Sequence, residues 1–206
     1  MSPVLPLVPW LAAASAVLFA IRLVLFAALH ALPGGVHPVR HAVSDYAASP
    51  EPRTRRLATA ASWSMAGAWV VLGAAVLADS AGSGAMAQPG LWMLVLGMVL
   101  ALMPLVPTDL PDAPTTLRGR MHLLMAIAWF TISYSEIGPM RRMLGGSALA
   151  GAVAVLGTVA AVGLAALIIS RLVPALRTRA FGISERVFIL AVTLAPLLLA
   201  IGLAAG

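Results

Sequence analysis

Two short polar segments of the chain hold most of the residues that could carry out acid–base, nucleophilic or anion-binding chemistry. They cover residues 37–49 and residues 107–122. Histidine and carboxylate side chains transfer protons, serine can act as a nucleophile, and arginine binds phosphate or carboxylate groups. The two segments are therefore the first candidates for a functional site. Their candidate ligand-binding residues are His37, Arg40, His41, Asp45, Tyr46, Asp109, Arg118 and His122.

Three polar residues could form a hydrolytic set, with Ser44 as nucleophile, Asp45 as orienting carboxylate and His122 as base. The sequence contains neither a nucleophile-elbow motif nor a glycine run for an oxyanion hole, so no motif supports this geometry. Both segments are equally compatible with solvated loops that cap helices. Thr116 precedes a helical pattern, and Asp109 lies among turn-forming prolines. The sequence thus does not decide whether the protein is an enzyme.

The four histidines raise the question of a metal or haem site. His37 and His41 are four residues apart, but a helix that starts at Pro38 makes His37 its cap rather than a helical metal ligand. The chain has no cysteine and no His-Glu-x-x-His motif. Phosphate-binding loops and dinucleotide fingerprints are missing as well. We therefore expect no metal and no cofactor.

The elements that must position the two segments are predicted to be membrane-spanning helices. Of the 206 residues, 61% are hydrophobic and 10% are charged, whereas soluble domains average about 25% charged residues. A helix crossing a ~30 Å hydrocarbon core needs about 20 apolar residues. We therefore expect an all-α polytopic membrane protein, with a single domain over residues 1–206. Its six transmembrane helices are expected as a bundle, at about residues 10–32, 57–78, 91–106, 117–137, 147–173 and 185–205.

The distribution of arginine predicts the orientation of this bundle. All thirteen basic residues are arginine, and ten of them lie in the segments after the first, third and fifth predicted spans. Because cytoplasmic loops are enriched in basic residues, we expect both termini outside and these three segments inside. The net charge of +6 is then a topology signal, and we expect no nucleic-acid partner. Both polar segments come to lie on the cytoplasmic side, where they can share one site.

Arg22 is the most costly residue of the predicted spans. It lies about halfway along the first span, where a charge costs at least ~2.5 kcal/mol. A buried arginine needs a carboxylate, carbonyl or phosphate partner. The candidates are Asp45, Asp109 and a lipid headgroup, so Arg22 is added to the candidate ligand-binding residues.

The fourth predicted span has a polar face. Its polar and aromatic residues recur at spacings of seven, four and three, which places them on one side of a helix. Because polar groups are costly in hydrocarbon, this face is expected to point into the bundle. Glu136, the last residue of this face, could instead lie at the membrane interface and pair with Arg141 or Arg142. The four residues are His122, Trp129, Ser133 and Glu136.

The two polar segments carry a resemblance to a known family. Residues 37–47 read His-Pro-Val-Arg-His-Ala-Val-Ser-Asp-Tyr-Ala, and Pro107-Thr108-Asp109 is followed by Thr116, Gly119 and His122. In these stretches the chain resembles the bacterial membrane family known as domain of unknown function 998. The resemblance implies six spans over nearly the whole chain and a place in the bacterial cytoplasmic (inner) membrane. The family is distantly similar to eukaryotic six-helix proteins tied to lipid-anchor remodelling and lipid asymmetry, a similarity of fold alone.

Three functions are compatible with these features. The protein could bind a membrane lipid, or another membrane protein subunit, through the polar residues of the cytoplasmic side. It could be a membrane-embedded hydrolase or transferase acting on a lipid or prenyl substrate, with His122 or Asp45 as acid or base. It could also be a small transporter, with Arg22 and Glu136 along its pathway. We expect the first of these, with membrane lipids as the partners.

Overall fold

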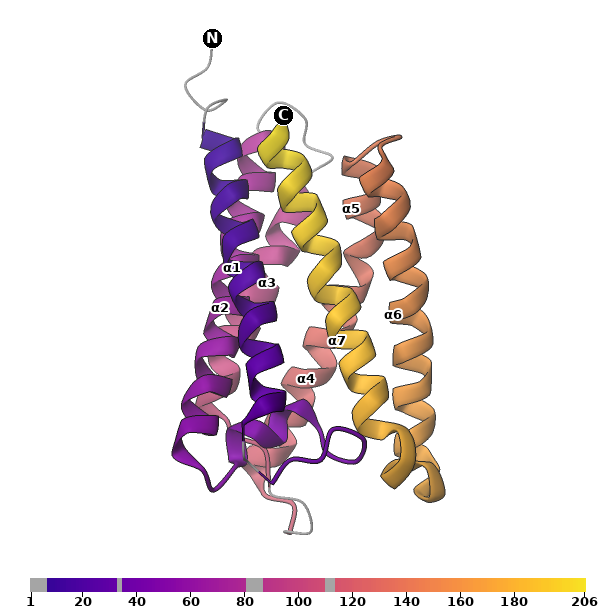
Figure 1. Ribbon diagram of the computed structural model, residues 1–206. Coiled ribbons are helices and arrows are strands. Elements are labelled where there is room, and N and C mark those ends of the chain that lie inside the picture. The colour runs from indigo at the N-terminus through magenta and orange to yellow at the C-terminus, as the bar shows by residue number, and fades with distance from the viewer. Residues whose placement is uncertain (1–6, 33–34, 81–86, 110–113) are drawn as a thin grey trace.

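The computed structural model describes residues 7–32, 35–80, 87–109 and 114–206. Every regular element within those residues is helical, and the long helices form an elongated bundle (Figure 1). In chain order the elements are α1 (Leu7–Ala31), η1 (Val43–Ala48), α2 (Pro52–Asp79), α3 (Ala87–Leu102), η4 (Met103–Leu105), α4 (Leu117–Ser135), α5 (Ile137–Met143), α6 (Ala148–Leu172) and α7 (Pro174–Ala205).

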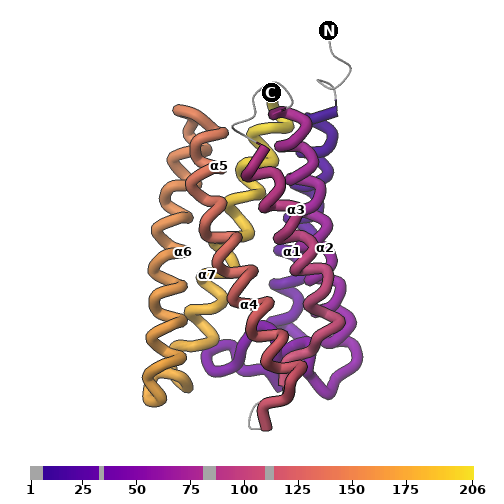
Figure 2. Tube along the Cα trace, turned by 180° about the vertical axis from the view of Figure 1, so that it is seen from behind, coloured from indigo at the N-terminus to yellow at the C-terminus, as the bar shows by residue number. Residues whose placement is uncertain are grey.

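Five helices of the described chain are long and apolar enough to cross a membrane. They are α1, α2, α3 together with η4, α6 and α7. The expected all-α, multi-pass architecture is therefore confirmed. A helix also forms at the fourth predicted span, but α4 is not among these five, because its first turns carry Arg118, Arg120 and His122. After Glu136 the chain continues as α5, and the two helices run one after the other along the bundle (Figure 2).

The last helix is longer than the sequence pattern predicted. The apolar pattern begins near residue 185, whereas α7 begins at Pro174 and runs for 32 residues. Proline is favourable in the first turn of a helix, where its missing N–H is not needed. The chain reverses its direction between α6 and α7 at the single residue Val173, whose backbone is extended. The three additional turns extend α7 toward the residue 37–49 segment.

The helix α1 packs against its neighbours through a regular seam. Its buried residues are separated alternately by four and three positions, the spacing of knobs-into-holes packing. Ser15 on this seam donates a hydrogen bond to the carbonyl of Ala68 in α2 (2.9 Å), and Ser64 of α2 donates one to Leu18 (2.8 Å). The seam consists of Val8, Ala12, Ser15, Phe19, Arg22, Phe26 and Leu29.

The connections of the bundle gather the polar segments at one end. The start of α1 and the end of α7 lie at the opposite end (Figure 1). We call the end of the bundle that holds the polar segments the polar end. It contains residues 35–51, residues 106–109, the start of α4 and the α6–α7 turn at Val173.

Candidate functional site

The His37–His41 turn at the polar end is stabilised by its own histidines. The carbonyl of His37 accepts hydrogen bonds from the N–H groups of Arg40 (3.1 Å) and His41 (2.9 Å). The Nδ1 atom of His37 accepts from the Val39 N–H, and Nδ1 of His41 accepts from the His37 N–H. An accepting Nδ1 leaves the proton on Nε2. The two imidazoles therefore hold a turn together, and Arg40 between them is exposed.

Arg186 of α7 anchors this turn to the bundle. Arg186 is 7% exposed, and its Nη1 donates to the carbonyls of Pro38 (2.8 Å), His41 (2.8 Å) and Gly182 (2.9 Å). Sequence reasoning assigned Arg186 only a topological role. A signal was present, because an adjacent glutamate and arginine stand at the start of an otherwise apolar run.

The same guanidinium also joins α7 to α1 and η1. Its Nε donates to Nε2 of His30 (2.8 Å), whose Nδ1 lies 2.7 Å from the carbonyl of Phe26. The His30 ring is therefore neutral, with its proton on Nδ1 directed at Phe26. The Arg186 guanidinium also lies over the ring of Tyr46, 5.7 Å from the centroid, and Tyr46 itself is buried. Arg186 thus connects three elements that are far apart in the sequence.

Two further groups of α7 complete this junction. The Gly182 N–H donates to the carbonyl of Val39 (2.9 Å), and a Cβ atom at position 182 would collide with the backbone of the turn. The buried carboxylate of Glu185 accepts from the N–H of Val43 (2.6 Å) at the start of η1. Only glycine allows the turn to approach α7 so closely.

Asp45 begins η1 rather than facing a catalytic partner. Its Oδ2 accepts a hydrogen bond from the N–H of Ala42 (2.9 Å). Burial raises the pKa of Asp45, and the Ala42 N–H together with the nearby charge of Arg186 opposes this rise. The half-buried Ser44 beside it makes no side-chain hydrogen bond to another described residue.

The second segment folds into a cap for α4. Asp109 accepts from the Thr116 N–H through Oδ2 (2.8 Å) and from the Thr116 hydroxyl through Oδ1 (2.6 Å). These two bonds hold the pKa of Asp109 below its usual value. The Thr116 hydroxyl in turn accepts from the Gly119 N–H (3.1 Å), and a Cβ at position 119 would collide with the Asp109 carboxylate. The spacing of Asp109, Thr116 and Gly119 is thus explained by one compact cap, and Arg118 beside it is exposed.

His122 lies about one helical turn after Gly119 in α4 and has one unpartnered nitrogen. Its Nδ1 lies 2.7 Å from the carbonyl of Val106, so the proton is on Nδ1. Its Nε2 is buried and has no hydrogen-bond partner among the described residues. Asp45 and Asp109 both lie close enough for their charges to interact with His122. The three residues therefore meet at the polar end, but His122 is oriented by a backbone carbonyl and not by Asp45.

The polar face of α4 points into the bundle, as the sequence predicted. His122, Trp129, Ser133 and Glu136 are all buried. Besides Nε2 of His122, the indole nitrogen of Trp129 and one carboxylate oxygen of Glu136 lack partners within the described chain. Arg142 lies close enough for its charge to act on Glu136.

Arg22 is buried without the partner that the sequence predicted. It is 6% exposed, its Nε makes no hydrogen bond to any described residue, and its guanidinium lies over the ring of Phe26 at 5.0 Å. The two carboxylates expected to pair with it are used elsewhere, since Asp45 binds Ala42 and Asp109 binds Thr116. No three histidine, aspartate or glutamate side chains of the described residues converge as a metal site.

These features define a multi-pass α-helical membrane protein with polar residues at one end and inside its bundle. The chain belongs to the family described as "Protein of unknown function (DUF998)", whose match covers residues 9–202. The family expected from the two polar segments is thereby confirmed. No match to a curated protein or to a solved structure was found.

Proposed function

We propose that this protein binds an anionic lipid, through its phosphate or carboxylate, inside the bundle beside Arg22. The observation that carries this proposal is the unpaired Nε of Arg22 within a buried seam. A charge at the centre of a membrane helix costs at least about 2.5 kcal/mol, and a buried charge without a counterion costs more. An anionic ligand that pairs with the guanidinium would offset this cost.

The packing of α4 supports an entry route for such a lipid. The helix packs mainly against α3, whereas α7 packs extensively against α6 and α1. The helix α4, whose buried side carries His122 and Trp129, is therefore packed less extensively against its neighbours than α7. The unpartnered nitrogens on this side offer a hydrogen-bond acceptor at His122 and a donor at Trp129 for the polar part of a lipid.

The proposal includes a topology with six spans and both termini outside, formed by a single domain over residues 1–206. Residues 117–143 form α4 and α5, and at 1.5 Å per residue they are about 40 Å long, enough for a sixth crossing. The arginines of the polar end then face the cytoplasm, which agrees with the positive-inside rule. We propose the bacterial cytoplasmic membrane as the location.

The lipid proposal predicts that Arg22 decides how much anionic lipid remains with the protein. Native mass spectrometry of protein purified in mild detergent should detect a bound anionic lipid. Arg22→Gln should reduce its occupancy at least about tenfold, the change that corresponds to ~1.4 kcal/mol. The variant should still fold, because it removes a buried charge whose Nε has no hydrogen-bond partner among the described residues.

The matched control is Arg120→Gln, which removes an exposed arginine from the polar end. It should leave the occupancy unchanged. An equal loss in both variants, or a wild-type protein that retains no anionic lipid, would contradict the proposal.

A second candidate function is a hydrolase or transferase acting on a lipid or prenyl substrate. The observation that favours it is His122, because Val106 holds its proton on Nδ1 and leaves a buried, unprotonated Nε2 as a base. Time-dependent lipid products in nanodiscs, formed by the wild type and not by His122→Gln, would support this function. A lipid that binds unchanged would eliminate it.

A further inference from the structure

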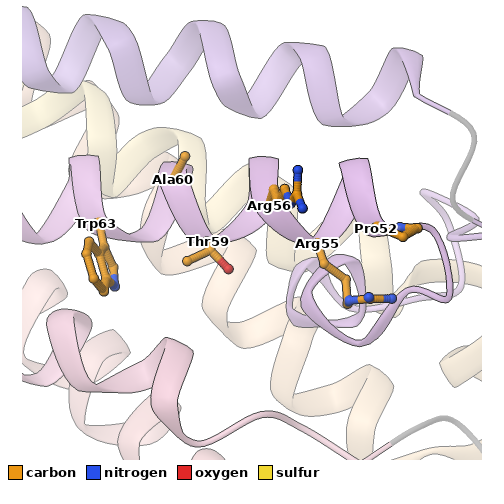
Figure 3. Close-up of a pocket in the computed structure, with 6 residues that line it drawn as sticks. All are labelled: Pro52, Arg55, Arg56, Thr59, Ala60 and Trp63. Carbon is orange, nitrogen blue, oxygen red and sulfur yellow. The ribbon is translucent and has the colours of Figure 1, made fainter.

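A hollow of about 390 Å³ lies on the outer surface of α2, near the polar end (Figure 3). It is separate from the Arg22 site, because none of its lining residues belongs to α1 or α4. Arg55, Thr59 and Trp63 point to the same side of the helix in Figure 3, as their four-residue spacing requires. The lining residues are Pro52, Arg55, Arg56, Thr59, Ala60 and Trp63.

The hollow changes from charged to apolar along the helix. Its arginines lie in the first two turns of α2, and Trp63 follows Arg56 by seven residues, about 10 Å further along the axis. The Trp63 side chain is 58% exposed within a helix that is apolar enough to span a membrane. Tryptophan is enriched where the headgroup region meets the acyl chains. The charged part of the hollow lies at the end of the helix and its apolar part toward the middle. This arrangement matches a phospholipid, whose charged headgroup is followed by apolar acyl chains.

The polar part of the hollow keeps hydrogen-bond donors available. Arg55 uses Nη1 to bind the carbonyls of Ser49 (2.9 Å) and Pro50 (2.9 Å), which fixes its guanidinium beside the hollow. Five N–H groups belong to a guanidinium, so Nε and Nη2 of Arg55 remain. Arg56 is exposed, and neither it nor the hydroxyl of Thr59 bonds to another described side chain or carbonyl. Arg55 and Thr59 point to one side of α2 and Arg56 to another side in Figure 3, and no acidic residue is among those that line the hollow between them.

We infer that this hollow binds one anionic phospholipid of the surrounding bilayer. The two guanidinium groups would bind the phosphate, the Thr59 hydroxyl would bind a glycerol ester oxygen, and Ala60 and Trp63 would contact an acyl chain. Charge complementarity selects an anionic phospholipid over a zwitterionic one, because the hollow contains two arginines and no acidic residue. This site goes beyond the proposed function and does not depend on it.

The exposure of Trp63 allows a direct test with brominated lipids, which quench nearby tryptophan. The protein is placed in nanodiscs of phosphatidylcholine with increasing brominated phosphatidylglycerol, and the Trp63 signal is taken as the difference between wild type and Trp63→Phe. Brominated phosphatidylglycerol should quench Trp63 more strongly than brominated phosphatidylcholine at equal content. Arg56→Gln should weaken this preference about fivefold, the factor expected for one basic residue near a membrane surface.

Three further variants make the test decisive. Thr59→Val, which retains both charges, should reduce quenching by both lipids alike, because the glycerol ester is common to them, whereas Arg179→Gln removes an exposed charge from α7 at the same end and should change neither the quenching nor the preference. Arg22→Gln should also leave Trp63 quenching unchanged, so failure of the proposed function is distinguishable from failure of this site. Equal quenching by the two lipids, or an equal effect of Arg56→Gln and Arg179→Gln, would overturn the inference.

Discussion

Arg22 and Arg186 show how differently a single residue type can behave in one bundle. Both are more than nine-tenths buried. Arg186 donates to three backbone carbonyls and to the His30 ring, so its charge is spread over hydrogen bonds. The Arg22 guanidinium lies over the face of Phe26, and its Nε has no hydrogen-bond partner among the described residues. We therefore assign a structural role to Arg186, whereas the proposed function gives Arg22 a ligand-binding role.

The structural role of Arg186 predicts a large effect of a charge-conserving substitution. Arg186→Lys keeps the charge but cannot reach the carbonyls of Pro38 and His41 and the His30 ring together. Because hydrogen bonds to charged groups contribute about 1.5–3 kcal/mol each, the variant should lower the unfolding free energy by at least about 2 kcal/mol. Thermal unfolding in detergent would measure this loss.

A readout specific to the turn is hydrogen exchange of the Gly182 and Val43 amides, which should become faster in Arg186→Lys. The matched control is Arg179→Lys, an exposed position on the same helix. Unchanged exchange in Arg186→Lys would contradict the anchoring role.

At the scale of elements, the two polar segments connect and cap helices. The segment at residues 37–49 is a turn and a short helix held by α7, through Arg186, Gly182 and Glu185. The segment at residues 107–122 caps α4, through Asp109 and Thr116. The backbone therefore uses most of the polar groups that the sequence offered for chemistry. Two exceptions are Nε2 of His122 and the Ser44 hydroxyl, which have no hydrogen-bond partner among the described residues.

The cap of α4 predicts that Gly119 does not tolerate a side chain. In Gly119→Ala the new methyl group would collide with the Asp109 carboxylate. Overpacking of this kind costs roughly 1–3 kcal/mol, so the melting temperature should fall. Gly151→Ala is the matched control, because a Cβ at that helical position meets no atom within 4 Å and alanine favours helix.

The same cap can be probed through a double-mutant cycle. Asp109→Ala removes the carboxylate that meets position 119, so adding Gly119→Ala to it should cost much less than in the wild type. Additive losses would show that the collision is not the cause.

At the scale of the whole molecule, the bundle gathers its polar connections at one end. The α1–α2 connection, the start of α4 and the α6–α7 turn all lie there (Figure 1). The proposed six-span topology places this end in the cytoplasm, because the exposed arginines of the described chain are concentrated there.

The topology is testable because the chain contains no cysteine. Single cysteines are introduced at Arg40 and Arg179 at the polar end and at Gly146 between α5 and α6, all of which are exposed. A membrane-impermeant maleimide added to intact cells should label only Gly146→Cys. Labelling of Arg40→Cys together with Arg179→Cys would reverse the orientation. Labelling of Arg40→Cys together with Gly146→Cys, or of Arg179→Cys alone, would exclude the sixth span.

The sequence by itself determined the all-helical membrane class, the positions of the helices, the buried face of α4 and the family. These depend on apolar length, on helical spacing and on short motifs, all of which are local properties of the chain. Only the tertiary structure decided which buried arginine is satisfied. Besides the nearby Gly182 carbonyl, Arg186 binds two carbonyls and a ring that lie 145 to 156 residues away. Every residue has a carbonyl, so no sequence pattern marks the ones that are used. For the same reason, only the fold could distinguish the polar groups that hold the bundle together from Nε of Arg22 and Nε2 of His122. These two atoms have no hydrogen-bond partner among the described residues.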